Sequence, residues 1–187
     1  MEALHTNIYN VLNHSSHEQY INGLNWYGDA RIEAERISIV SGKPFITVCA
    51  VIAALSPMTP WEKNQVDAYE MCCGNTQHIY TTFGANVSKA KRLLNMVDYS
   101  AIVDELNGLK TVAFFDNIFN EESEHITIDS HMLSIAFGKK LSKVERPSMT
   151  SYKYHTISDG IKRLADQNNL RPYELQAILW VTWRETV

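Results

Sequence analysis

Apolar residues recur at three- and four-residue steps along most of this chain, which is the spacing of one face of an α-helix. Strand signals are weak, because the β-prone Ile126-Thr127-Ile128 is long enough only for an extended lead-in to the next element. The pattern therefore predicts an all-α protein of roughly ten short helices. We expect helices over residues 4–12, 17–40 (with Gly28 as a candidate break), 45–55, 61–73, 88–96, 98–106, 110–119, 129–137, 150–167 and 172–184.

The length of 187 residues suits one domain or two small lobes that share a core. Its longest apolar run, Phe45–Leu55, falls short of the roughly 18 residues that a membrane span needs, so we expect no membrane partner. The first residues lack the basic-then-apolar layout of a signal peptide. The expected location is therefore the cytoplasm.

The formal net charge of −4 argues against avid, nonspecific binding of nucleic acid, since such binding depends on neutralising phosphates. One basic face on an acidic body remains compatible with this charge. The candidates are Lys89, Lys91 and Arg92, and a second group formed by Lys139, Lys140, Lys143 and Arg146. A solvated surface is the simpler interpretation of each group.

The three cysteines, Cys49, Cys72 and Cys73, do not have the spacing of a metal site. Cys49 lies in the apolar run and is expected in the core. The sequence predicts no disulfide framework, no iron–sulfur cluster, no metal and no other cofactor.

Asp129 stands between the β-branched Ile126–Ile128 and an apolar segment of helical period. Asp is a preferred helix N-cap because its carboxylate accepts hydrogen bonds from the free N–H groups of the first turn. A catalytic carboxylate held at a helix N-terminus is the second interpretation. The two are compatible, since a helix N-terminus stabilises negative charge.

Three segments occur in an order that resembles the helix-hairpin-helix DNA glycosylase superfamily, which includes the endonuclease III and 8-oxoguanine glycosylase branches. They are VIAALSPMTPWEKN (51–64), SKAKRLL followed by LNGLKTVAFF (88–94 and 106–115), and ITIDSHMLSIAFG (126–138). The resemblance covers nearly half of the chain. It implies a two-lobed helical fold, with one lobe over about residues 45–140 and the other over about 1–44 plus 141–187.

The resemblance also implies a catalytic role for Asp129. Breaking an N-glycosidic bond gives the sugar oxocarbenium character, which a nearby carboxylate stabilises. Bifunctional members carry a lysine about 18 or 19 residues earlier, and Lys110 lies 19 residues before Asp129. Such an amine can attack the anomeric carbon and form a Schiff base, which gives AP lyase activity. The target base must first leave the stack.

The hairpin departs from the family pattern, which reads roughly L-P-G-V-G-x-K-T-A and uses two glycines to bind a phosphate. Here Gly108 alone remains, and Leu109-Lys110 follows it directly. A gapless alignment would place Val112 at the lysine position. Lys110 is therefore a catalytic lysine, a phosphate-binding lysine or a solvated turn residue, and the sequence leaves these open.

Trp61 and Asn64 fall where glycosylases place a loop that probes the duplex or lines the base pocket. Trp61 either stacks on an extruded base or packs on the core. Lys63 either contacts phosphate or faces water. His131 matches the family's D-x-H pattern, with a structural hydrogen bond as its simpler role.

Other segments, NWYGDA (25–30) and QAILWVTWR (176–184) among them, resemble a group of small phage-associated proteins, which implies no activity. Gln176, Trp180, Trp183 and Arg184 share one helical face. Core packing explains the tryptophans most simply. Gln176 and Arg184 are costly to bury without partners, so they sit at an edge or serve a site.

The predicted function is a DNA glycosylase that acts on a damaged or modified base, in the host cytoplasm if the protein is phage-encoded. An enzyme of modified-pyrimidine or free-nucleotide metabolism on the same fold is one alternative. A catalytically inactive phage binding or inhibitor protein is the other, and the degraded hairpin motivates it.

Overall fold

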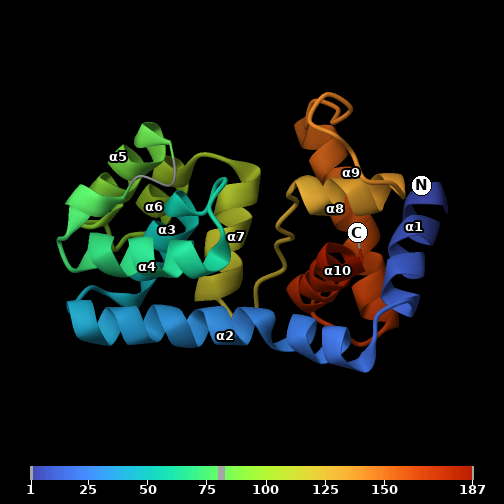
Figure 1. Ribbon diagram of the computed structural model, residues 1–187, viewed down its shortest axis with the longest axis horizontal. Coiled ribbons are helices and arrows are strands. Elements are labelled where there is room, and N and C mark those ends of the chain that lie inside the picture. The colour runs from blue at the N-terminus through green and yellow to red at the C-terminus, as the bar shows by residue number, and fades with distance from the viewer. Residues whose placement is uncertain (1, 80–82, 187) are drawn as a thin grey trace. The chain divides into compact units, whose positions relative to one another are not determined.

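The computed structural model describes residues 2–79 and 83–186, and within these ranges it contains helices but no strand (Figure 1). The all-α prediction is confirmed. The helices are α1 (Glu2–Asn13), α2 (His17–Ser41), α3 (Phe45–Leu55), α4 (Trp61–Cys72), the 3-10 helix η1 (Thr76–His78), α5 (Gly84–Leu93), α6 (Tyr99–Leu106), α7 (Leu109–Phe119), α8 (Ser130–Phe137), α9 (Ser151–Gln167) and α10 (Pro172–Thr186).

The ends of most helices follow the local signals in the sequence. Pro60 precedes α4, and Asp98 caps α6 by accepting a hydrogen bond from the Ala101 amide at 2.9 Å. The main difference is α5, which begins at Gly84, four residues before the expected start. Its first turn contains a glycine, an asparagine and a valine, which have weak helix propensity, so the sequence carries no helix signal there. Helix α2 is continuous through Gly28.

The chain divides into two compact units. Residues Met1–Tyr27 and Glu122–Val187 form the terminal unit, and residues Gly28–Glu121 form the central unit. These limits differ from the lobes that the resemblance implies, because α8 belongs to the terminal unit. Its apolar residues, among them Met132 and Ile135, pack in one cluster with residues of α1, α9 and α10.

Helix α3 is the core of the central unit. Nine of its eleven residues are buried, and it packs against α4, α5, α6 and α7. A helix that is apolar on all sides needs such a cover. Among the described residues, no single helix has the length and apolar character to cross a membrane; α2 and α3 satisfy that test only as a pair, with a 116° bend between them.

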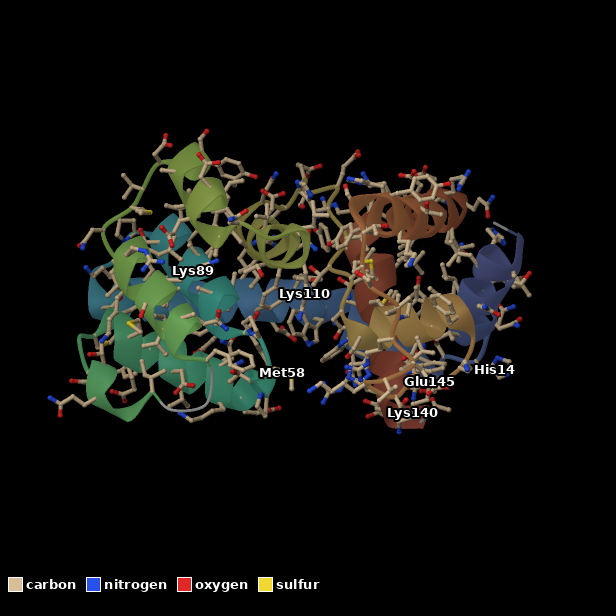
Figure 2. All side chains as sticks on the ribbon, turned by 90° about the horizontal axis from the view of Figure 1, so that it is seen from above. His14, Met58, Lys89, Lys110, Lys140 and Glu145 are labelled. Carbon is tan, nitrogen blue, oxygen red and sulfur yellow. The ribbon has the colours of Figure 1, made fainter. Side chains whose placement is uncertain are left out.

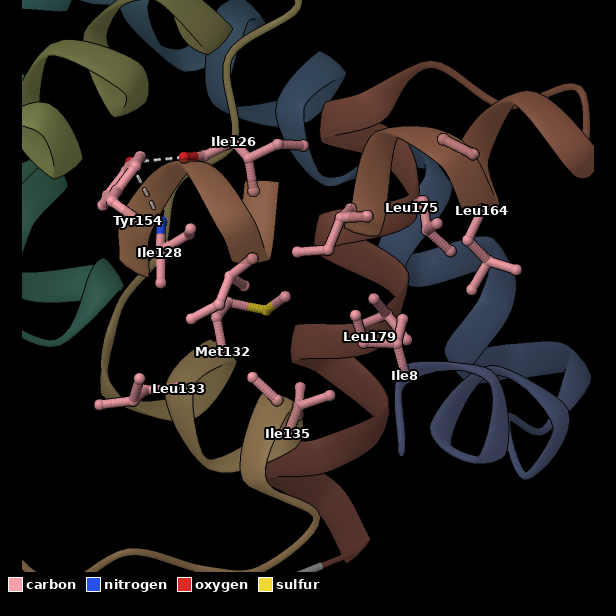
Figure 3. Packing of buried hydrophobic residues seen from close by; sticks show 14 of the residues in the cluster. Ile8, Ile126, Ile128, Met132, Leu133, Ile135, Tyr154, Leu164, Leu175 and Leu179 are labelled. Atoms are coloured by element: carbon pink, nitrogen blue, oxygen red, sulfur yellow. Dashed lines mark hydrogen bonds between the residues drawn. The ribbon is translucent and has the colours of Figure 1, made fainter. Parts of the chain in front are cut away.

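The core of the terminal unit includes Ile126 and Ile128 of the extended segment that leads into α8 (Figure 3). Tyr154 of α9 fixes this segment: its hydroxyl donates to the Ile126 carbonyl at 2.5 Å and accepts from the Ile128 amide at 3.4 Å. Burial raises the pKa of Tyr154 to about 12. The hydroxyl therefore remains a neutral donor at physiological pH.

Replacing Tyr154 with Phe should lower the free energy of unfolding by about 1–3 kcal/mol, since the buried Ile126 carbonyl loses its donor. Urea unfolding followed by circular dichroism measures the change. Tyr152→Phe, on the same helix but 81% exposed, is the matched control and should change stability by less than about 0.5 kcal/mol. Equal effects of the two substitutions would contradict the assigned role.

Candidate functional site

Asp129 is the N-cap of α8. Its Oδ1 atom accepts hydrogen bonds from the backbone amides of His131 at 2.8 Å and Met132 at 2.9 Å. The extended segment held by Tyr154 delivers the aspartate to this position. The cap that the sequence predicts is therefore present.

The second carboxylate oxygen has a partner that the sequence did not predict. The indole N–H of Trp180, in α10, donates to Asp129 Oδ2 at 3.0 Å. An ionised carboxylate offers about four lone-pair sites, and three donors occupy three of them. One acceptor site therefore remains on Oδ2 of a half-buried, firmly positioned side chain.

Trp180 is the centre of a group of side chains within the terminal unit. The Arg184 guanidinium carbon lies 4.3 Å from the Trp180 ring centroid, a cation–π contact. The rings of Trp26 and His131 lie edge-on to the same indole, with centroids 5.8 and 6.3 Å from its own. We call Asp129, His131, Trp26, Trp180 and Arg184 the Trp180 cluster. It brings together an acceptor, a cation and three aromatic rings.

Gln176 lies on the same helix but is buried, with 5% of its surface exposed. The Tyr27 hydroxyl lies 2.8 Å from Gln176 Oε1 and 3.1 Å from Thr127 Oγ1. This network joins α2, the extended segment and α10. The structure therefore gives the buried Gln176 an internal partner, and its contact with substrate stays a prediction.

In the central unit, Asn107 and Gly108 form the turn between α6 and α7. Asn107 is the left-handed residue, with φ 44° and ψ 56°, whereas Gly108 has an extended φ of −173°. An added Cβ at Gly108 would come no closer than 3.7 Å to its neighbours. The turn therefore does not require a glycine at position 108.

Lys110 is the second residue of α7 and is half-buried (Figure 2). It has no hydrogen-bond or ion-pair partner among residues 2–79 and 83–186. Lys89 of α5 instead holds the turn, since its ammonium group donates to the Leu106 carbonyl at 2.5 Å. An unpaired lysine at the start of a helix is available for a ligand, and its role stays a prediction.

Helix α4 carries the other expected site residues, and it gives each of them a partner inside the central unit. The Trp61 ring packs edge-on against Phe114 at 6.4 Å. Lys63 forms an ion pair with the buried Asp67. Asn64 is 1% exposed and donates through Nδ2 to the Ile52 carbonyl at 3.1 Å. These contacts correspond to the structural interpretations of Trp61 and Lys63, and they place Asn64 away from any exposed loop.

Several residues of the two basic groups are also paired. Arg92 bonds to Glu105 at 2.7 Å, and Lys139 bonds to Glu145 at 3.1 Å (Figure 2 labels Glu145). Ser142 and Lys139 hold the pKa of the Glu145 carboxyl at about 2. No group of three or more potential metal ligands occurs in the part of the chain that the structure describes.

Fold and site define an all-helical protein whose candidate site is a helix-capping aspartate bonded to a tryptophan N–H. The chain belongs to the family of unknown function DUF7178, whose model matches residues 1–187. Neither the comparison with curated proteins nor that with solved structures finds a match. The function must therefore be argued from the site.

Proposed function

We propose that this protein hydrolyses the N-glycosidic bond of a damaged or modified base in DNA, with Asp129 as its catalytic carboxylate. The observation that carries the proposal is the fixed position of Asp129, which three N–H groups hold while one acceptor site stays open. The resemblance of TIDSH and its neighbouring segments to helix-hairpin-helix glycosylases supports the same reaction.

The chemistry requires a negative charge close to the sugar. The bond between C1′ and the base nitrogen breaks with both electrons on the base, and water adds to C1′ while its proton goes to the departing base. A carboxylate beside C1′ stabilises the oxocarbenium character and orients that water. Because Asp129 is already ordered, it needs no reorganisation at the moment of reaction.

The rest of the Trp180 cluster suits a nucleotide. Trp26 and Trp180 offer aromatic surface on which a base can stack, which contributes about 1–3 kcal/mol per base. Arg184 is exposed and carries the cation that a phosphate needs. His131 borders the same indole.

The test is base release from single- and double-stranded DNA that carries uracil, oxidised, alkylated or phage-type hypermodified bases, with wild type and Asp129→Asn. Strand breaks that appear only after alkali would identify a monofunctional glycosylase. Breaks without alkali that vanish in Lys110→Ala, together with borohydride trapping, would assign the lyase nucleophile to Lys110. Base release that is equal in Asp129→Asn would overturn the proposal.

A free nucleotide is the second candidate substrate, and the pairing of the basic side chains favours it. Arg92 and Lys139 have acidic partners, so fewer cations remain for a long phosphate backbone. Release of base from nucleotides but not from DNA, with little dependence on salt, would select this candidate.

Trp180→Phe tests whether the indole N–H positions Asp129. Phe keeps an aromatic ring against Trp26 and Arg184 but removes the donor, so kcat should fall about tenfold with little change in KM. Trp183→Phe, three residues along α10, is the matched control and should leave kcat unchanged. A rise in KM with constant kcat would instead assign Trp180 to substrate binding.

A further inference from the structure

A cavity of about 240 Å³ lies in the terminal unit, between α1, the end of α10 and the turn after α8. It is separate from the Trp180 cluster, because Gly138 and Asp129 flank opposite ends of α8, which is about 12 Å long. The described residues that line it include no lysine, arginine, aspartate or glutamate. They are Asn7, Asn10, Val11, His14, Gly138, Thr182, Trp183 and Thr186.

Most polar groups in the cavity present lone pairs. The Thr182 hydroxyl donates to the Ile178 carbonyl at 2.8 Å, and the Thr186 hydroxyl donates to the Thr182 carbonyl at 2.6 Å. Both protons are therefore engaged within α10, which leaves the two hydroxyl oxygens as acceptors. The Ser15 hydroxyl lies 2.8 Å from Thr182 Oγ1 and 3.3 Å from the Val11 carbonyl oxygen; whichever of the two hydroxyls donates to the other, Thr182 Oγ1 keeps at least one lone pair.

Two residues of α1 add to this set. Asn7 Nδ2 donates to the Ala136 carbonyl at 3.0 Å, so its amide oxygen remains as an acceptor. His14 Nδ1 lies 2.6 Å from the Asn10 carbonyl oxygen, which can only accept. In the neutral ring Nδ1 therefore carries the hydrogen, and Nε2 presents a lone pair (Figure 2 labels His14).

The backbone around the cavity is also negatively polarised. Helices α1, α8 and α10 end at Asn13, Phe137 and Thr186, each within one residue of a lining residue. A helix C-terminus carries a partial charge of about −0.5. The three helix C-termini near the cavity therefore attract a cation. Trp183 adds aromatic surface, against which a cation also binds favourably.

We propose that this cavity binds a primary ammonium group, either of a small amine or of the amine-bearing end of a longer molecule. Three N–H donors match the surplus of acceptors from Asn7, His14 and the two threonines. The volume is below the roughly 300 Å³ at which pockets for drug-sized ligands begin, so the bound part is small. Among the described lining residues, a phosphate or carboxylate would find N–H donors only on Asn7, Asn10 and Trp183 and would also lie close to three helix C-termini, so the cavity favours a cation over an anion.

The first test titrates the whole protein at pH 8 with benzylamine, benzyl alcohol and benzoate, following the Trp183 indole N–H and the Asn10 side-chain amide by NMR. Benzylammonium should bind at least ten times more tightly than benzyl alcohol, and benzoate should not bind. Equal binding of the alcohol and the ammonium, or no benzylammonium binding at tens of millimolar, would overturn the proposal.

Charge substitutions at Asn10, which is exposed on α1, provide the second test without disturbing the core. Asn10→Asp should tighten benzylammonium binding at least threefold, whereas Asn10→Lys should abolish it. Asn13→Lys is the matched control, because Asn13 is exposed on the same helix but does not line the cavity. If both lysine variants weakened binding equally, the ammonium would not occupy this cavity. The site does not depend on the role of Asp129, so either proposal can fail alone.

Discussion

Asp129→Asn is expected to lower kcat for base release by at least about a hundredfold while the protein stays folded. The substitution removes the negative charge that the oxocarbenium ion needs. It keeps an amide oxygen that can still cap α8, since Asn and Asp are comparable N-caps. The loss should therefore appear in the chemical step and not in the amount of folded protein.

The contact with Trp180 adds a second expectation for this variant. If the oxygen of the introduced side-chain amide caps the helix, its NH₂ group faces the Trp180 N–H, and two donors then meet where an acceptor and a donor were paired. Loss of this hydrogen bond should lower the free energy of unfolding by about 1–2 kcal/mol. Single-turnover kinetics and urea unfolding on the same preparation separate the two effects.

Asp98→Asn is the matched control, because Asp98 caps α6 in the central unit through the Ala101 amide and has no tryptophan partner among the described residues. We expect unchanged kcat and a stability change below about 0.5 kcal/mol. An Asp129→Asn variant as active as Asp98→Asn would reduce Asp129 to a cap. Catalysis would then depend on other residues, whereas a wild-type protein that releases no base from any substrate would favour the binding-protein alternative.

The helices could be predicted because their signals are local. Each of these signals spans only a few residues, and the structure follows them. They include the apolar run Phe45–Leu55, Pro60 before α4 and the Asn107-Gly108 turn. Asp129 as an N-cap is a signal of the same kind. Such features need no knowledge of the tertiary fold.

The candidate site needs contacts between distant segments, and these have no local signal. Trp180 bonds to Asp129 across 51 residues, and Tyr27 bonds to Gln176 across 149. A helical pattern shows that Gln176 and Trp180 lie on similar faces of α10, but not that one has a buried partner and the other a carboxylate. Lys63 and Asp67 differ from these pairs, because their i,i+4 spacing on the expected helix 61–73 is a local signal for the ion pair that the structure contains.

Gly23→Ala is expected to destabilise the protein strongly, by at least about 2 kcal/mol, although alanine is the better helix former. Gly23 lies where α2 and α10 approach each other within the terminal unit. An added Cβ would come within 2.3 Å of the Ile178 Cα atom and 2.7 Å of its amide nitrogen. Backbone atoms cannot move aside as a flexible side chain can, so the two helices must separate. Urea unfolding measures the change.

Gly28→Ala is the control that separates this contact from helix propensity. Gly28 lies five residues further along α2, and an added Cβ there would have no atom within 4 Å. The same substitution should therefore stabilise the protein, by about 0.5–1 kcal/mol. If the two substitutions changed the free energy of unfolding in opposite directions, they would establish the close approach of α2 to α10. The same approach places Trp26 beside Trp180. If Gly23→Ala were as stabilising as Gly28→Ala, the packing of the Trp180 cluster would need revision.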